Sequence, residues 1–291
     1  MSENNDYVQR FLLDDLDIRG ALVRLGPVWQ QLLTDRDYPH VVIGLLGQMS
    51  ATTLLLADNL KQAGRLTIQL RGDGPIPLLV IDCNEALNIR CMAQHDEKVD
   101  DAAPLQELLG DGQLLISLDL PSMREPYQSI VPITGNSIAE VFEHHLAQSE
   151  QLASRLFLAA TPEGAAGLFI QKMPGADARD EDGWARIEAL AATVKPDELL
   201  ELPAEALLTR LFAEETVRLF AAREVTNICP ENRDKVGTML LSLGREEVYA
   251  ALTERGEIVV RDDLANREYR FDKAAIDELF SHTPATPPSV H

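Results

Sequence analysis

The sequence predicts an α+β fold, with an N-terminal antiparallel-sheet domain with flanking helices, a helical linker region and a small C-terminal α/β unit. Apolar residues first follow a helical period and then alternate with a period of two. Strand-like runs follow one another through tight turns, with helices apart from them, which is typical of antiparallel α+β domains. The expected parts are an N-terminal domain at 1–175, a linker at 176–223, a C-terminal unit at 224–282 and a disordered tail at 283–291.

Helical spacing marks segment 28–63, where Pro39 is expected to start the longer helix. Its apolar stripe is most simply a core face. A further helix is expected at SIAEVFEHHLAQSEQL, with Asn136 or Ser137 as its cap and Glu140 near the capping-box position.

Strands are expected on both sides of the Gly72-Asp73-Gly74-Pro75 turn, in RLTIQLRGDGPIPLLVID. The Gly-Asp-Gly run also invites a phosphate-loop interpretation, but it lacks the G-x-x-x-x-G-K spacing, and a hairpin turn explains it better. Five more strands are predicted: ALNIRCMA, a hairpin of DGQLLISLDL and PYQSIVPIT, and the pair SRLFLAA and GLFIQKMP.

The polar, acidic stretch GADARDEDG after Pro174 indicates a boundary. Helices are expected at 184–194 and 203–220, interrupted by Lys195-Pro196 and Leu202-Pro203. In the C-terminal unit, TMLLSL, GREEVYAALTERG and KAAIDELF are expected to be helical, with strands EIVVRDD and NREYRF around a turn at 262–266.

Composition is that of a soluble globular protein of 291 residues, with 45% hydrophobic and 25% charged residues. The net charge of −21 disfavours nucleic acid and anionic lipid as partners. The N-terminus MSENNDYVQRF has no signal-peptide pattern, and no window approaches 18 uninterrupted apolar residues. A cytoplasmic location is therefore expected, with no membrane partner.

Catalytic chemistry finds little support in the residue pattern. The three cysteines, Cys83, Cys91 and Cys229, argue against a secreted disulfide scaffold. Cys83 and Cys91 could face each other on neighbouring strands, although buried thiols acting as small hydrophobes are more common. Cys229 has no histidine within easy sequence reach to serve as a base. We therefore expect no enzyme activity.

Several blocks carry a resemblance that runs nearly end to end. They are RGALVRL at 19–25, DYP at 37–39, TIQLRGDGPIPLLVI at 67–81, SEQLASRLF at 149–157, MPGAD at 173–177, ELLELPAEALLTRLFAEE at 198–215, EEV at 246–248, GEI at 256–258 and YRF at 269–271. The chain resembles the 33-kDa heat-shock protein family, the redox-regulated holdase chaperones of bacteria. In that family the C-terminal unit binds zinc through a C-x-C and a C-x-x-C pair, and oxidation unfolds this unit and the preceding linker.

Here the family's zinc pattern is broken. Cys229 aligns with the first ligand, while Glu231, Asp262 and Ala265 occupy the other three positions. One thiolate with carboxylates is a poor zinc set, because structural sites favour cysteine and histidine. Zinc, the family's usual cofactor, is therefore predicted to be absent, and Cys229 is interpreted as a relic.

The resemblance implies an ATP-independent holdase that binds unfolding or partly folded client proteins and prevents their aggregation. Without the redox switch it would be constitutive or heat-triggered. The candidate client-binding residues are the apolar side chains of the linker: Leu199, Leu200, Leu207, Leu208, Leu211, Phe212, Leu219 and Phe220. These residues could also simply pack on the sheet at rest. The alternative is an adaptor for one specific partner that lost holdase activity. A homodimer is possible by the resemblance.

Overall fold

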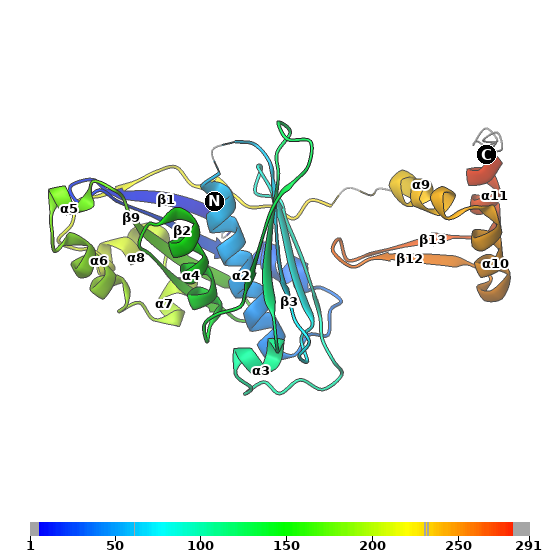
Figure 1. The fold of residues 1–291 in the computed structure, drawn as a ribbon, viewed down its shortest axis with the longest axis horizontal. Coiled ribbons are helices and arrows are strands. Elements are labelled where there is room, and N and C mark those ends of the chain that lie inside the picture. Colours follow the sequence, from blue (N-terminus) through cyan, green and yellow to red (C-terminus); the bar gives the residue numbers. More distant parts are fainter. Residues whose placement is uncertain (1–5, 61, 230, 232, 282–291) are drawn as a thin grey trace. The chain divides into compact units, whose positions relative to one another are not determined.

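The computed structural model describes residues 6–60, 62–229, 231 and 233–281 (Figure 1). By its internal contacts the chain forms two compact units, residues 1–228 and residues 229–291. Each unit has a hydrophobic core of its own, and unit 1 has two.

The first sheet of unit 1 runs in the order β10-β1-β2-β9-β8, and every neighbouring pair is antiparallel. A short strand, β11, also pairs with β1. The strands are β1 Tyr7–Leu13, β2 Ile18–Leu25, β8 Ser154–Ala160, β9 Ala165–Lys172, β10 Val217–Leu219 and β11 Arg223–Glu224.

The second sheet of unit 1 runs in the order β5-β4-β3-β6-β7 and is also antiparallel. Its strands are β3 Arg65–Arg71, β4 Leu78–Asn84, β5 Ile89–Gln94, β6 Gln113–Asp119 and β7 Tyr127–Pro132. The predicted hairpins are confirmed. A Cβ at Gly72 would lie 1.7 Å from the carbonyl oxygen of Leu109, in helix α3 (Leu105–Leu109), so the turn needs glycine for this close approach.

Helix α2 (His40–Asp58) contacts strands of both sheets and begins directly after Pro39, as predicted. It follows α1 (Pro27–Leu33). By length and composition α2 could cross a membrane, but most of its residues are buried inside the protein. Its apolar composition therefore serves the core between the two sheets.

Helix α4 (Ile138–Glu150) packs on β8 and on α2. The Ser137 hydroxyl accepts a hydrogen bond from the Glu140 amide at 3.2 Å, and the Glu140 carboxylate accepts one from the Asn136 amide at 2.7 Å. The predicted capping is confirmed, with Ser137 as the cap.

Four helices from the linker segment (residues 176–223) follow: α5 Ala176–Arg179, α6 Gly183–Ala191, α7 Pro196–Glu201 and α8 Ala204–Leu211. They cover the face of the first sheet that points away from α2 (Figure 1). The alternation along β2 shows this, because Val23 joins the core around α2 whereas Leu22 joins the core under α8.

Two sequence-based expectations need correction. Strands β1 and β2 were not anticipated, because the predicted elements began at residue 28. The predicted helix at 203–220 ends at Leu211, and residues 217–219 form β10 instead. The open edge of β1 supplies partners that a helix could not use: Phe11 faces Leu219 in register, and the Phe220 amide donates to the carbonyl of Arg10 at 2.9 Å.

Unit 2 contains the elements expected for it: α9 Arg233–Leu243, α10 Arg245–Arg255, β12 Ile258–Asp262, β13 Arg267–Phe271 and α11 Lys273–Ser281. Its small core gathers Leu240, Val248, Leu252, Tyr269, Phe271 and Ile276. The expected tail at 283–291 lies outside the described residues. The expected boundaries at 175, 223 and 282 stay predictions.

Candidate functional site

Most of the candidate client-binding residues of the linker segment gather in one apolar cluster against the first sheet. The side chains of Leu199, Leu207, Leu208, Leu211 and Phe212 are buried in it, and Leu200 and Leu219 pack against it half-buried. Phe220 is 41% exposed and lies apart from this cluster. The structure therefore shows the packed arrangement of these residues.

The opposite wall of the cluster comes from the sheet. Phe11 and Leu13 of β1, Leu22 of β2, and Leu168 and Ile170 of β9 are all buried there. The rings of Phe11 and Phe212 lie with their centroids 6.1 Å apart, tilted by 35°. The sequence pattern did not single out these five sheet residues as part of the site, although the alternation of YVQRFLL and IRGALVRL is a strand signal that could have identified the first three.

Polar contacts between the linker segment and the rest of unit 1 lie at the margins of the cluster. Lys172 pairs with Asp177 at 2.5 Å, Arg155 pairs with Glu188 at 2.5 Å, and the Tyr7 hydroxyl accepts from the Ala204 amide at 3.2 Å. The ion pairs are partly exposed, and such pairs contribute about 0–1 kcal/mol each. These three contacts therefore add little to the apolar packing that holds α6 and α8 on the sheet.

A groove of about 310 Å³ separates α8 from β10 in this closed arrangement. Leu208, Phe212 and Leu219, three of the candidate residues, line it together with Val217. Glu205 and Glu215 stand at the same groove. Leu208 and Phe212 are nevertheless almost fully buried, so of these three only Leu219 offers side-chain surface to solvent before any rearrangement.

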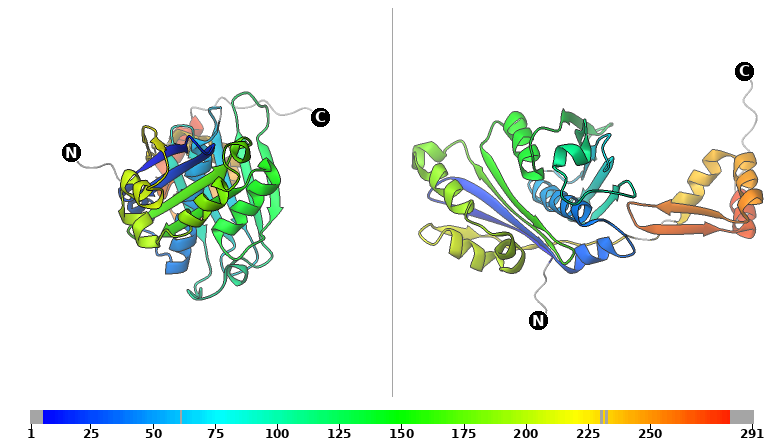
Figure 2. Two further views of the ribbon diagram at one scale, coloured as in Figure 1. Left: turned by 90° about the vertical axis from the view of Figure 1, so that its left-hand side faces the viewer. Right: turned by 90° about the horizontal axis from the view of Figure 1, so that it is seen from below.

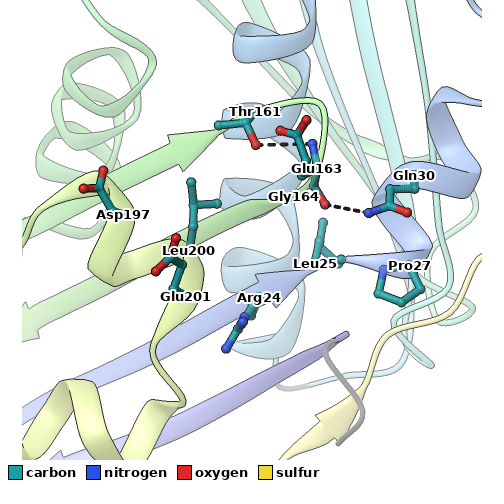
Figure 3. Close-up of a pocket in the computed structure, with 11 residues that line it drawn as sticks. Arg24, Leu25, Pro27, Gln30, Thr161, Glu163, Gly164, Asp197, Leu200 and Glu201 are labelled. Atoms are coloured by element: carbon teal, nitrogen blue, oxygen red, sulfur yellow. Dashed lines mark hydrogen bonds between the residues drawn. The ribbon is translucent and has the colours of Figure 1, made fainter. Parts of the chain in front are cut away.

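A larger pocket of about 560 Å³ lies where α7 meets the start of α1 and the β8–β9 turn (Figure 3). Its charged lining comes from Arg24, Glu163, Asp197 and Glu201, beside Leu200. The Gln30 amide donates to the Glu163 carbonyl at 3.0 Å and fixes the turn at the rim (Figure 3). Since α7 forms one wall, this pocket lies at the boundary between the linker segment and the sheet.

The end of the linker segment is tied to α2 and β1 by a buried carboxylate. Asp58 has a side chain only 1% exposed, and it pairs with Arg223 at 2.5 Å and with Arg10 at 3.4 Å. Just beyond, Val225 is buried in the core around α2, and Asn88 exchanges two hydrogen bonds with the backbone of Ile228, at 2.7 and 2.9 Å. Unit 1 therefore has a firm attachment point immediately before unit 2 begins.

Of the four positions that the family resemblance aligns with zinc ligands, two contact each other in the structure. The Asp262 carboxylate accepts a hydrogen bond from the Ala265 amide at 2.9 Å and closes the β12–β13 turn. Ala265 has no donor atom on its side chain, Glu231 is exposed, and Cys229 is half-buried. Among the described residues, no group of three or more His, Cys, Asp or Glu side chains is placed to hold a metal ion. These residues do not fit a tetrahedral zinc site.

Cys83 and Cys91 are both fully buried, and burial raises the pKa of each thiol from 9.0 to about 12. In register, Cys83 faces Ile89 while Cys91 faces Ile81, so the two cysteines are diagonal neighbours. Diagonal neighbours lie roughly 7–8 Å apart, beyond the reach of a disulfide without movement of the backbone. Both thiols are free.

Glu143 and His145 of α4 carry perturbed pKa values with a structural cause. Burial raises the pKa of Glu143 and lowers that of His145. The Glu143 carboxylate accepts a hydrogen bond from the Leu156 amide at 2.7 Å, which fastens α4 to β8. Glu143 therefore has an evident role in packing.

Comparison with known proteins identifies the fold. The crystal structure of the 33 kDa chaperonin (heat shock protein 33 homolog) from Thermotoga maritima superposes with a TM-score of 0.79 at 23% identity, covering 94% of this chain and 98% of that one. The 33 kDa chaperonin of Methylobacillus flagellatus is 40% identical over 95% of each chain. That of Chromobacterium violaceum is 39% identical over 96% of this chain and 95% of its own.

The class that this fold and these relatives define is the 33 kDa chaperonins, and a chaperone role follows for the chain. The family model described as Hsp33 protein matches residues 6–272. The chain belongs to the Hsp33 family. The α+β fold expected from the sequence is confirmed.

Proposed function

We propose that this protein is an ATP-independent holdase that binds unfolding proteins after its linker segment leaves the first sheet. The observation that carries the proposal is the two-sided apolar cluster between α6–α8 and the sheet. When the linker segment leaves the sheet, both sides of this cluster become exposed: the linker leucines with Phe212, and the sheet residues around Phe11. Exposed apolar patches larger than a few hundred Å² usually mark binding sites.

The linker helices are too short to persist alone. Helix α7 has 6 residues and α8 has 8, whereas isolated helices shorter than about 12–15 residues are marginal in water. Once detached, the segment becomes a flexible chain that carries apolar side chains. Such a chain adapts to clients of different shape, which suits a chaperone that binds many proteins.

We assign the trigger to heat, or to a constitutive equilibrium, in place of oxidation. Three of the four zinc-ligand positions lack cysteine, and Asp262 is engaged in the turn of unit 2. The buried thiols Cys83 and Cys91 are protonated at neutral pH, because their pKa values are about 12, and the thiolate is the reactive form. The proposed mechanism involves no zinc and no catalytic residue.

The partners of this proposal are unfolded or partly folded proteins in the cytoplasm. The net charge of −21 keeps the opened protein in solution while it carries sticky surface. The same charge disfavours nucleic acid and anionic membranes as partners. A homodimer stays possible by family membership.

The test is suppression of client aggregation by the reduced, chelator-treated protein at room and heat-shock temperatures, with and without peroxide. We expect protection of several unrelated clients that does not depend on peroxide and that increases on heating. Absence of protection under every condition would remove the holdase proposal. Protection that needs peroxide would contradict the assignment of the trigger and show that a cysteine still senses oxidant.

A further inference from the structure

The hairpin β6–β7 exposes apolar side chains even though the linker segment is packed on the first sheet. Met123, Tyr127 and Ile130 are 49%, 58% and 60% exposed, respectively. Strand β7 is the last strand of the second sheet and pairs with β6 alone among the described strands. The left view of Figure 2 shows this green hairpin at the outer edge of the sheet.

The backbone pattern shows which groups of β7 point away from the sheet. The Ile133 amide donates to the carbonyl of Gly112 in the β6 direction, at 3.0 Å. Since neighbouring residues of a strand alternate, Tyr127, Ser129 and Val131 face β6 in the same way. The backbone N–H and C=O groups of Gln128 and Ile130 therefore point outward.

Two prolines delimit this open edge. Counting every second residue from Gln128 and Ile130, Pro126 and Pro132 are the next positions whose backbone groups point outward. Proline has no N–H and is tolerated on an edge strand where the donor would face solvent. The edge thus keeps only the outward donors of Gln128 and Ile130, with acceptors on both sides of them. This window fits a single short extended segment.

The chemistry of the edge favours an uncharged segment. Residues 126–135 contain no charged side chain, although natural edge strands are commonly protected by charges. Ile130 stands beside Leu115 on one face of the sheet, and Tyr127 stands beside Leu118 on the other. An incoming strand therefore meets apolar contacts on both faces, at alternate residues.

We propose that β7 binds one extended, uncharged segment of a non-native polypeptide by strand addition while the linker segment is closed. This site deepens the proposed holdase function and rests on it, because unfolding proteins are the source of such segments. It gives the client a first contact on unit 1 that does not require opening.

A second copy of this chain suits the edge less well. Antiparallel pairing of two copies about Ser129 places the prolines at 126 and 132 opposite each other, so hydrogen bonds are lost at both ends. Each copy also carries a net charge of −21, which opposes association. An uncharged client segment has neither disadvantage.

The test measures binding of a fluorescent, end-blocked peptide of alternating threonine and valine to the full-length reduced protein at room temperature. The variant Ile130→Lys adds a charge at the edge, and Gln128→Pro removes an outward N–H without touching the β6 ladder. We expect both to weaken binding about tenfold or more, as the loss of hydrogen bonds and apolar contact implies. The control Val259→Lys makes the same change on exposed β12 of unit 2 and should leave affinity unchanged.

Three results would overturn the edge site. One is equal affinity of the parent and both β7 variants, whose folding is checked by circular dichroism. Another is peptide binding that appears only at temperatures at which the linker segment opens. The third is a dimer of the parent in sedimentation experiments that is lost in both variants and whose formation competes with peptide binding. This result would assign the edge to a second copy. Peptide binding without aggregation suppression would remove the proposed holdase function and leave the edge site standing.

Discussion

At the residue scale, one hydrogen bond joins two of the positions that the family resemblance aligns with zinc ligands. The Asp262 carboxylate accepts from the Ala265 amide at the β12–β13 turn, and Asn266 completes the turn with a φ of 51°. Asparagine tolerates this left-handed conformation better than most residues. The turn therefore keeps its shape by local side-chain chemistry.

Replacement of Asp262 by alanine should destabilise unit 2 by about 1 kcal/mol, the usual net contribution of a hydrogen bond. Hydrogen exchange of the β12 and β13 amides in the full chain measures the effect. Asp263→Ala is the matched control, because Asp263 is an exposed neighbour whose ion pair with Arg261 contributes little. Equal protection in the two variants would contradict the role given to Asp262.

The buried thiols predict a pH dependence of stability. The folded pKa values of Cys83 and Cys91, about 12, lie above the ordinary value of 9.0. Above pH 9 the unfolded chain loses these protons first, so unfolding is favoured as pH rises. The contribution is fully present below pH 9 and is lost progressively up to about pH 12.

Denaturant unfolding across this alkaline range checks the prediction against a Cys83→Ala, Cys91→Ala double variant. The variant should show a shallower loss of unfolding free energy above pH 9, because lysines and tyrosines titrate equally in both proteins. Parallel curves would show that burial does not protect these thiols.

At the element scale, the linker segment depends on what it packs against. Phe212 is 1% exposed and contacts Phe11, and truncation of such a buried ring costs about 3–5 kcal/mol. Since this contact exists only in the closed arrangement, Phe212→Ala should lower the temperature at which aggregation suppression begins.

Phe220→Ala is the control for this experiment, because Phe220 is exposed at the end of the same segment. It should leave the onset temperature close to that of the parent. An unchanged onset in Phe212→Ala, with the protein still folded, would show that α8 does not gate the client surface.

The sequence predicts the elements that have regular local patterns. It does not predict those whose conformation depends on pairing with a distant strand. The hairpins β3–β4 and β6–β7 follow from alternation and turn residues, and α2 follows from its apolar period. The TVRLF stretch at 216–220 continues the spacing of a helix, so nothing local announces that it joins the edge of β1. Tertiary pairing overrides propensity here.

The sequence indicated the apolar linker residues of the candidate site, but not the strand residues that pack against them. A run of leucines in 199–211 indicates an apolar face whatever its fold. Which strands oppose it depends on the order β1-β2-β9-β8, in which segments more than a hundred residues apart become neighbours. Sequence spacing carries no direct record of that order.

At the scale of the whole molecule, the loss of cysteine at three of the four aligned zinc-ligand positions predicts insensitivity to metal. A structural zinc stabilises a small metal domain by about 10–16 kcal/mol, so its removal from a zinc protein is conspicuous. Here a strong chelator, and added zinc, should leave thermal unfolding and aggregation suppression unchanged. Elemental analysis of the purified protein checks the metal content directly. A large drop in stability with chelator would contradict the assignment.

We propose that the linker segment opens before the rest of unit 1 unfolds, and hydrogen exchange followed by mass spectrometry over a temperature series tests this claim. We predict that the amides of α6–α8 and β10 lose protection while those of α2, β3 and β4 remain protected, and that this loss coincides with the onset of aggregation suppression. Simultaneous loss of protection in all these elements would contradict the claim, because the client surface would then be a product of global unfolding.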